Sequence, residues 1–264
     1  MSCGSNESSD TVASFGRGQA TPAGYERVAP APGVTMLVVR GLDAPALAAR
    51  VLEPPADALV RHFGRAGLHA LPLDDGGCAL VRSYRHGGVL RGLTRGWFVS
   101  RPPRPFVELT ITASARARGV ATPEVLAAVV AHGLGPWYRG WLVTREIAGA
   151  RNLWDALRED LSGYETKDLL LRRVGRALRL MHGRGVEHGD LNLRNILVLD
   201  GSHGPEVYII DLDKARLSPG AVSAVRAHAN LRRLLRSINK LDPERVHVRL
   251  SDWNSLLEGY DGHG

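Results

Sequence analysis

The residues best suited to chemistry lie in one short stretch of the chain, 188–195, with the sequence HGDLNLRN. Four residues separate Asp190 from Asn195, and Asp211 closes the second of two short apolar segments that follow. Carboxylates accept protons from hydroxyl groups, and carboxylate and amide oxygens are the ligands that hard divalent cations prefer. A turn at 188–190 and a strand-end cap at Asp211 are the ordinary structural alternative. Three such elements in order, after a long amphipathic helix, favour a chemical role.

This stretch resembles the catalytic loop and metal-binding segment of the protein-kinase-like fold, where His-Arg-Asp-x-x-x-x-Asn precedes a hairpin and Asp-Phe-Gly. The resemblance implies phosphoryl transfer from ATP, with Asp190 as the base that orients and deprotonates the attacking hydroxyl. His188 would brace the loop. Asn195 and Asp211 would hold the Mg²⁺ ions that neutralise phosphate charge. Residues 211–213 read Asp-Leu-Asp, so a switch based on a flipping phenylalanine is not expected.

A kinase-like fold also requires a cation for the nucleotide phosphates on its third strand and a glutamate on the next helix. The first 166 residues contain no lysine, so the strand expected at 79–84 must supply an arginine. Arg82 is the candidate and Arg85 the second choice. Glu108 is the expected partner because it is the first acidic residue after Asp75. Arginine binds phosphate as well as lysine does, although a solvated edge-strand arginine is the alternative.

Two further parts of a nucleotide site match this pattern loosely. Gly64 and Gly67, in the segment GRAG just before the second strand, could present backbone amides to phosphate. The full G-x-G-x-x-G pattern is missing, and a plain turn fits almost as well. After the fifth strand, Glu146 and Ile147 are expected to border adenine through their backbone groups.

The N-terminal half narrows the resemblance to one family. The segment 81–88, VRSYRHGG, then a basic aromatic stretch and PFVE at 105–108, is similar to the bacterial lipopolysaccharide kinase family. That family includes kinases of 3-deoxy-D-manno-octulosonic acid (Kdo) and of core heptose. The segments 188–197 and 210–216, HGDLNLRNIL and IDLDKAR, are closest to the Kdo kinase branch, and the similarity covers about residues 60–240. It implies transfer of the ATP γ-phosphate to a sugar hydroxyl of the inner core, most simply Kdo attached to lipid A, at the cytoplasmic face of the inner membrane.

Two features agree with an anionic glycolipid acceptor. Six arginines and no acidic residue lie between Arg82 and Val107, interleaved with Trp97, Phe98 and Phe106. Such a surface suits an anionic glycolipid and peripheral contact with an anionic membrane, while a solvated loop is the ordinary alternative. Nucleic acid would suit the same composition but is not expected. Only 53 residues follow Asp211, and no Ala-Pro-Glu occurs among them, so a small or glycan acceptor is favoured over a peptide.

Two other functions stay open. A phosphotransferase of the aminoglycoside type shares the His-Gly-Asp-x-x-x-x-Asn pattern, although such enzymes usually have a larger C-terminal lobe. A pseudokinase that binds nucleotide without catalysis is suggested by the missing lysine, and the intact Asp190, Asn195 and Asp211 count against it.

The elements that must position these residues indicate a two-lobed α+β fold of the protein-kinase-like type. A strand-rich half with one helix at 106–118 precedes a half with a helix at 166–182 and a hairpin at 196–210. We expect a disordered tail over 1–33, an N-lobe with an antiparallel sheet over 34–145, and a small, mostly helical C-lobe over 146–264. In the C-terminal helix around 230–241, basic residues lie opposite an apolar face, which indicates core packing with a basic exterior or contact with a membrane surface.

Composition excludes several classes of protein. The chain has 264 residues, 44% of them hydrophobic, which is ample for a folded core. No apolar run approaches the roughly 18 residues of a membrane span, and two cysteines cannot form a disulfide scaffold or a zinc cage. The first ten residues show no export signal, so the cytoplasm is expected. The net charge of +7 suggests an anionic partner.

Overall fold

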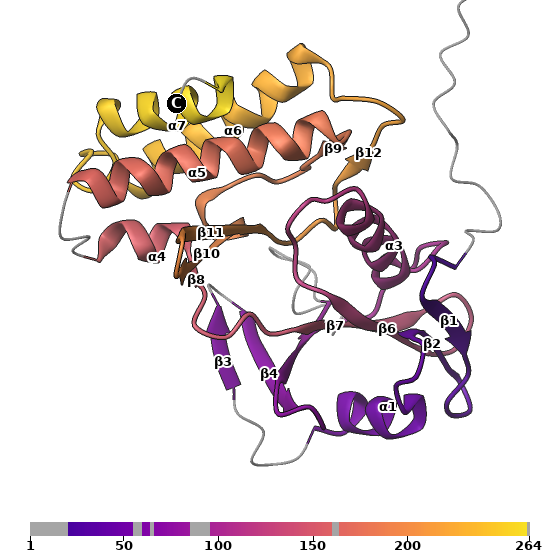
Figure 1. Ribbon diagram of the computed structural model, residues 1–264. Coiled ribbons are helices and arrows are strands. Elements are labelled where there is room, and N and C mark those ends of the chain that lie inside the picture. The colour runs from indigo at the N-terminus through magenta and orange to yellow at the C-terminus, as the bar shows by residue number, and fades with distance from the viewer. Residues whose placement is uncertain (1–20, 55–59, 64–65, 85–95, 160–163, 263–264) are drawn as a thin grey trace, which may run out of the picture.

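The computed structural model describes residues 21–54, 60–63, 66–84, 96–159 and 164–262. In Figure 1 the N-terminal half of the chain forms a sheet in the lower part and the C-terminal half a layer of helices above it. The strands of the sheet are β1 (Tyr25–Val28), β2 (Val34–Val39), β3 (Val60–Phe63), β4 (Ala66–Pro72), β5 (Cys78–Ser83), β6 (Val125–His132) and β7 (Tyr138–Arg145). They lie in the order β1-β2-β6-β7-β5-β4-β3, and each neighbouring pair is antiparallel.

Alternating side chains give the sheet two apolar faces. In β2, Met36 and Val38 pack in the cluster around helix α1 (Ala44–Leu52), and Leu37 packs in the cluster around helix α3 (Arg104–Ala117). Successive strand residues point to opposite sides, so α1 and α3 cover opposite faces of the sheet (Figure 1). The helix α3 carries Glu108 to the sheet face that it covers.

Two parts of the N-terminal half correct the sequence prediction. Of the tail expected over 1–33, Tyr25–Val28 forms β1, because it pairs with β2 and the buried Tyr25 hydroxyl donates to the Val125 carbonyl (2.7 Å). Residues 1–20 lie outside the described part of the chain. The prediction of a single helix here omits α1, whose first turn is capped by Asp43 accepting from the Ala46 N–H at 3.0 Å.

In its described ranges the C-terminal half has four helices, two of which pack against a hairpin. The helices are α4 (Leu153–Arg158), α5 (Tyr164–Gly183), α6 (Ala224–Leu241) and α7 (Leu250–Asp261), and the 3₁₀ turn η1 spans Leu193–Asn195. The strands are β8 (Arg151–Asn152), β9 (Val186–Glu187), β10 (Ile196–Gly201), β11 (Gly204–Ile209) and β12 (Arg216–Leu217). Strand β10 lies between β11 and β8, and β9 pairs with β12. The hairpin predicted at 196–210 is present as β10–β11, and the strand expected at 79–84 is β5, which pairs with β4.

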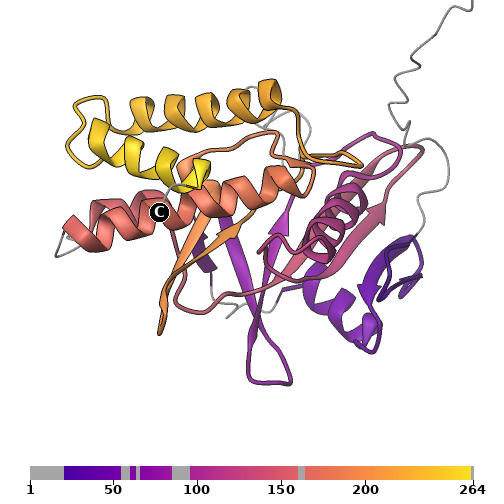
Figure 2. The ribbon, with the colours of Figure 1, turned by 45° about the horizontal axis from the view of Figure 1, so that its top comes forward.

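Helices α5 and α7 lie close together (Figure 2), and glycines permit the approach. A Cβ atom at Gly175 would lie 2.1 Å from the Leu256 carbonyl oxygen, and one at Gly259 would lie 2.2 Å from the Arg172 carbonyl oxygen. No side chain fits at these distances, so glycine is required on both helices. The Lys167–Asp252 ion pair (2.5 Å) joins the same two helices.

The predicted division at 145/146 stays a prediction, although β7 ends at Arg145. No helix in the described ranges is long and apolar enough to cross a membrane.

Candidate active site

His188 anchors the loop 188–195, which we call the catalytic loop. Its ring is fully buried; Nε2 donates to the Ile210 carbonyl (2.9 Å), and Nδ1 accepts from the Asp190 N–H (3.0 Å). Burial lowers the pKa of His188, so the ring is neutral and its proton sits on Nε2, as both bonds require. The loop is thereby tied to the end of the β10–β11 hairpin. A third bond, from the Ile210 N–H to the Asn195 carbonyl (3.0 Å), strengthens this link.

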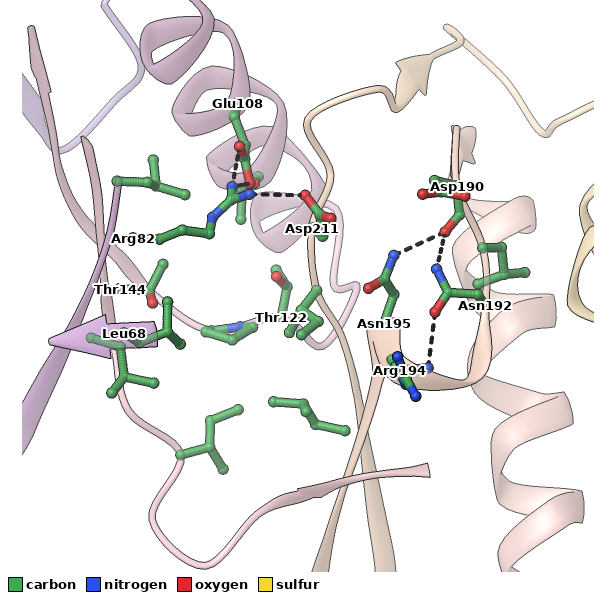
Figure 3. A pocket seen from close by; sticks show the side chains of 18 of the residues that line it. Leu68, Arg82, Glu108, Thr122, Thr144, Asp190, Asn192, Arg194, Asn195 and Asp211 are labelled. Atoms are coloured by element: carbon green, nitrogen blue, oxygen red, sulfur yellow. Dashed lines mark hydrogen bonds and ion pairs between the residues drawn. The ribbon is translucent and has the colours of Figure 1, made fainter. Parts of the chain in front are cut away.

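Two asparagines shape the loop around Asp190. The side-chain amides of Asn192 and Asn195 each donate to the Asp190 carbonyl oxygen at 2.9 Å. Because the Asn195 amide nitrogen is used in this way, its oxygen is left to face the cavity, as Figure 3 shows. The Asp190 carboxylate is exposed and makes no hydrogen bond within the described part of the chain, so it can accept a proton from a bound hydroxyl.

Asp211 stands across the cavity from the catalytic loop. Its φ of 61° is in the left-handed region, which is uncommon for a residue other than glycine and marks a constrained position. One carboxylate oxygen accepts from the Arg82 guanidinium at 3.3 Å. Figure 3 shows Asp211 and Asn195 on facing sides of the same space.

Arg82, on β5, joins Asp211 to helix α3. Its guanidinium donates to both carboxylate oxygens of Glu108 at 2.5 Å, and the Tyr84 hydroxyl also donates to Glu108. Burial raises the pKa of Glu108, and the adjacent guanidinium opposes that rise. Burial also raises the pKa of Tyr84 well above its usual value, so the phenol stays protonated and keeps donating. The structure thus brings Arg82 and Glu108 together as the sequence predicted. Arg85 lies outside the described residues.

A second ion pair connects α3 to the Asp-Leu-Asp segment. Arg104, the first residue of α3, pairs with Asp213 and lies over the rings of Tyr84 and Phe98, with centroid distances of 5.7 and 5.5 Å. Asp213 occupies the third position of the segment, where most kinases have glycine, and its carboxylate is held by Arg104. Sequence reasoning missed both Tyr84 and this pair.

One cavity of about 760 Å³ unites these groups. From the sheet side it is lined by Leu68, Leu80, Arg82, Glu108, Leu142, Glu146 and Ile147, and from the catalytic loop side by Asp190, Asn192, Arg194, Asn195, Leu197 and Asp211. His188 is not among the lining residues, and its buried ring holds the loop in place through hydrogen bonds to Ile210 and Asp190. Gly67 lies in β4 opposite His62, and Gly64 lies outside the described residues.

The cavity fits a nucleotide with its metal. Leucines of the sheet and hairpin offer apolar walls beside the chain at 146–147, where the Ile147 N–H makes no hydrogen bond to another described residue. Asn195 and Asp211 supply two oxygen donors, and the described residues contain no group of three or more acidic, histidine or cysteine side chains that could hold a metal ion. A small oxygen-only donor set suits Mg²⁺, which keeps waters and phosphate oxygens as its other ligands.

Asn230 is a further residue that sequence reasoning missed. It is fully buried, and its side-chain oxygen accepts from the His188 N–H (3.0 Å) and faces His182 Nε2 (3.4 Å). It therefore holds the start of the catalytic loop against α6. A single amide within an otherwise apolar helix face was the signal that could have revealed it.

Comparison with known proteins identifies the family to which the chain belongs. A sequence profile of the lipopolysaccharide kinase (Kdo/WaaP) family matches residues 58–260. The chain belongs to this family. The chain is 35% identical over 187 residues to a 3-deoxy-D-manno-octulosonic acid kinase of Vibrio vulnificus (strain CMCP6), with 69% of this chain and 75% of the relative covered. It is 32% identical over 190 residues to a kinase of the same description from Xylella fastidiosa (strain M23), with 70% and 72% covered.

A solved structure of WaaP in complex with acyl carrier protein matches this chain with a TM-score of 0.52. The match is 20% identical and covers 77% of this chain and 78% of the other. At this identity the likeness shows the fold alone, and it confirms the predicted two-lobed, protein-kinase-like α+β architecture. The predicted family is also confirmed, and the protein is a phosphotransferase whose family implies the use of ATP.

Proposed function

We propose that the protein phosphorylates a sugar hydroxyl of the lipopolysaccharide inner core, with Kdo attached to lipid A as the acceptor. The observation that carries this proposal is the single cavity in which the Asp190 carboxylate faces the Arg82–Glu108–Asp211 cluster. Relatives named as Kdo kinases, which are identical to this chain at 35% and 32% of the aligned residues, support the choice of acceptor.

In this mechanism Asp190 orients the acceptor hydroxyl and takes its proton as the oxygen attacks the γ-phosphorus. The new O–P bond forms while the bond from the γ-phosphorus to the bridging oxygen breaks, and ADP leaves with that electron pair. Arg82 binds phosphate oxygens through the part of its fork that Glu108 leaves exposed. Asn195 and Asp211 would hold Mg²⁺, which supplies positive charge to the phosphates when bound. His188 keeps the loop in position without touching the reacting atoms.

We propose in addition that the enzyme lies peripherally on the anionic cytoplasmic face of the inner membrane. The turn between β6 and β7 exposes Leu134 (93%) and Trp137 (46%), and Val99 nearby is 53% exposed. The guanidinium of Arg139 lies 4.7 Å from the ring centroid of Trp97 beside this turn. Aromatic and aliphatic side chains next to arginine suit the interface of an anionic bilayer. Sedimentation with phosphatidylglycerol vesicles, compared between wild type and Leu134→Ser, tests this placement; equal binding would contradict it.

The test of the kinase proposal is the substitution Asp190→Asn, which keeps the shape of the side chain and removes the proton acceptor. Turnover with Kdo-bearing lipid A should fall by roughly 10²–10⁴-fold, while nucleotide affinity changes little, because Asp190 acts on the acceptor. Transfer is measured as phosphorylated glycolipid by mass spectrometry, and nucleotide affinity by titration without acceptor.

The matched control is Asp200→Asn. Asp200 is a carboxylate on the hairpin, 2.8 Å from Arg151 and outside the cavity lining, so its loss should leave turnover unchanged. If Asp190→Asn retains near-wild-type turnover, Asp190 is not the base. If wild type binds ATP but transfers phosphate to no glycolipid, the pseudokinase interpretation replaces the proposal.

A further inference from the structure

Helix α6 presents a row of cations to the cavity. Arg233, Arg236 and Lys240, which we call the α6 basic face, all line it, together with Ser237. They are spaced by three, four and seven residues, which places them on one side of a helix. The sequence interpretation gave these residues a solvent-facing or membrane-facing role, but in the structure they border the space that contains Asp190.

The α6 basic face joins the cavity at the catalytic loop. The Arg233 guanidinium donates to the His188 carbonyl at 3.3 Å, and the Ser237 hydroxyl accepts from the Leu193 N–H at 3.3 Å. Arg194, in the loop itself, adds a fourth cation to this end of the lining. Arg82, which serves the proposed phosphate site, is instead on strand β5 and pairs with Glu108 and Asp211. The four cations therefore border the catalytic-loop side of the cavity, apart from the proposed phosphate site.

The described part of the chain supplies these cations with no carboxylate partner. Within the described ranges, no carboxylate lies at ion-pair distance from Arg194, Arg233, Arg236 or Lys240. By contrast, the lining residue Arg145 pairs with both Asp75 and Glu124, at 2.7 and 3.0 Å. Cations that border a cavity without a carboxylate partner attract anions, and arginine forks bind carboxylate and phosphate groups through paired hydrogen bonds.

From these observations, and resting on the proposed function, we propose that the α6 basic face and Arg194 form an acceptor subsite for the anionic groups of the glycolipid. The ligand chemistry is a carboxylate or phosphate oxygen. An octulosonic acid carries a carboxylate on the same sugar as its hydroxyls, and lipid A carries phosphates. The subsite selects an acidic acceptor over a neutral sugar and sets the approach of its hydroxyl to Asp190.

The test replaces Arg236 and Lys240 together by glutamine. Both side chains are exposed and form no hydrogen bond to another described residue, so the fold should be unaffected. The value of kcat/KM for Kdo-bearing lipid A should fall by about 10- to 100-fold, mostly through KM, because two charge-assisted contacts are lost. Nucleotide affinity, titrated without acceptor, should stay within about 2-fold. Arg232→Gln is the matched control, since this exposed arginine on α6 does not line the cavity.

Two modified acceptors identify the anion. One has its sugar carboxylate reduced to an alcohol, and the other lacks the lipid phosphates. The double substitution should cause no further loss with the acceptor that lacks the recognised group, and should keep its full effect with the other. An equal loss with both acceptors would overturn the proposal, as would weakened nucleotide binding with an unchanged acceptor KM.

A binding measurement separates this inference from the proposed reaction. Wild type and the double variant are titrated with Kdo-bearing lipid A in the presence of a non-hydrolysable ATP analogue, so that no transfer is needed. Weaker binding by the variant supports the subsite even if wild type transfers no phosphate, an outcome that would reject the proposed function alone. Equal binding by wild type and variant would overturn the subsite.

Discussion

The substitution Arg82→Ala should destabilise the protein because it leaves a carboxylate buried without its cation. The side chain of Glu108 is 3% exposed and that of Arg82 30%, so the unpaired charge stays in the interior. Removing one partner of a buried ion pair costs about 3–5 kcal/mol. The Tyr84 hydroxyl still donates to Glu108, which places the expected loss near the lower value. In a chain of this length such a loss lowers Tm by about 6–12 °C.

A second substitution separates stability from function. In the Arg82→Ala background, Glu108→Gln removes the orphaned charge and should restore most of the lost free energy of unfolding. It should not restore nucleotide affinity, because the cation for the phosphates is still missing. Loss of that charge-assisted contact is worth about 1.5–3 kcal/mol, or roughly 10- to 150-fold in affinity. Arg82→Lys should lie between wild type and Arg82→Ala in both properties, since the charge returns without the fork.

The assay is urea unfolding at neutral pH together with nucleotide titration, for wild type, the two single variants of Arg82 and the double variant. The reasoning is refuted if Arg82→Ala unfolds within about 0.5 kcal/mol of wild type, the usual range for a surface substitution. It is equally refuted if Glu108→Gln brings no recovery of stability. Recovery of nucleotide affinity in the double variant would show that Arg82 does not contact phosphate.

Three further outcomes are expected. Gly189→Ala should lower kcat by about 10²-fold in steady-state assays, because the added Cβ would lie 2.2 Å from the Lys214 carbonyl and displace the loop; unchanged kcat would contradict this. Tyr84→Phe should lower the free energy of unfolding, measured by denaturant titration, by about 1–3 kcal/mol, since buried Glu108 loses a donor. An unchanged free energy of unfolding would contradict this prediction. Burial lowers the pKa of His188 below 6.5, so the unfolded chain takes up the proton first. The contribution of His188 to the free energy of unfolding should therefore be constant above about pH 6.5 and fall on acidification towards the folded pKa, so urea unfolding of His188→Gln should show a smaller loss of stability at acidic pH than wild type.

The catalytic loop could be predicted from sequence because its residues are nearly contiguous. Only four residues separate Asp190 from Asn195, and Asp211 follows a hairpin whose turn residues are visible in the sequence. Arg82 and Glu108 could be predicted by elimination, since the N-terminal half offers no lysine and few acidic residues. In each case the sequence pattern and the expected fold assign the role to the same residue.

The remaining features depend on contacts between distant residues. Arg104 and Asp213 are 109 positions apart, and nothing local distinguishes Arg104 from the other arginines of its stretch. The α6 basic face has the pattern of a solvated helix surface, and only the packing of α6 beside the catalytic loop turns it towards the cavity. Strand β1 was missed because an edge strand with one buried residue, Tyr25, has little apolar periodicity to detect.

The crossing of α5 and α7 at Gly175 and Gly259 links helix α7 to the catalytic loop. The crossing positions Tyr260, whose hydroxyl lies 2.8 Å from His182 Nδ1, and the other nitrogen of that ring faces Asn230, which holds the His188 N–H. Removing α7 would remove Tyr260 and weaken the hydrogen bonds through His182 and Asn230 that hold the start of the catalytic loop. Loss of activity on removal of α7 would therefore report on the catalytic loop rather than on a missing substrate contact.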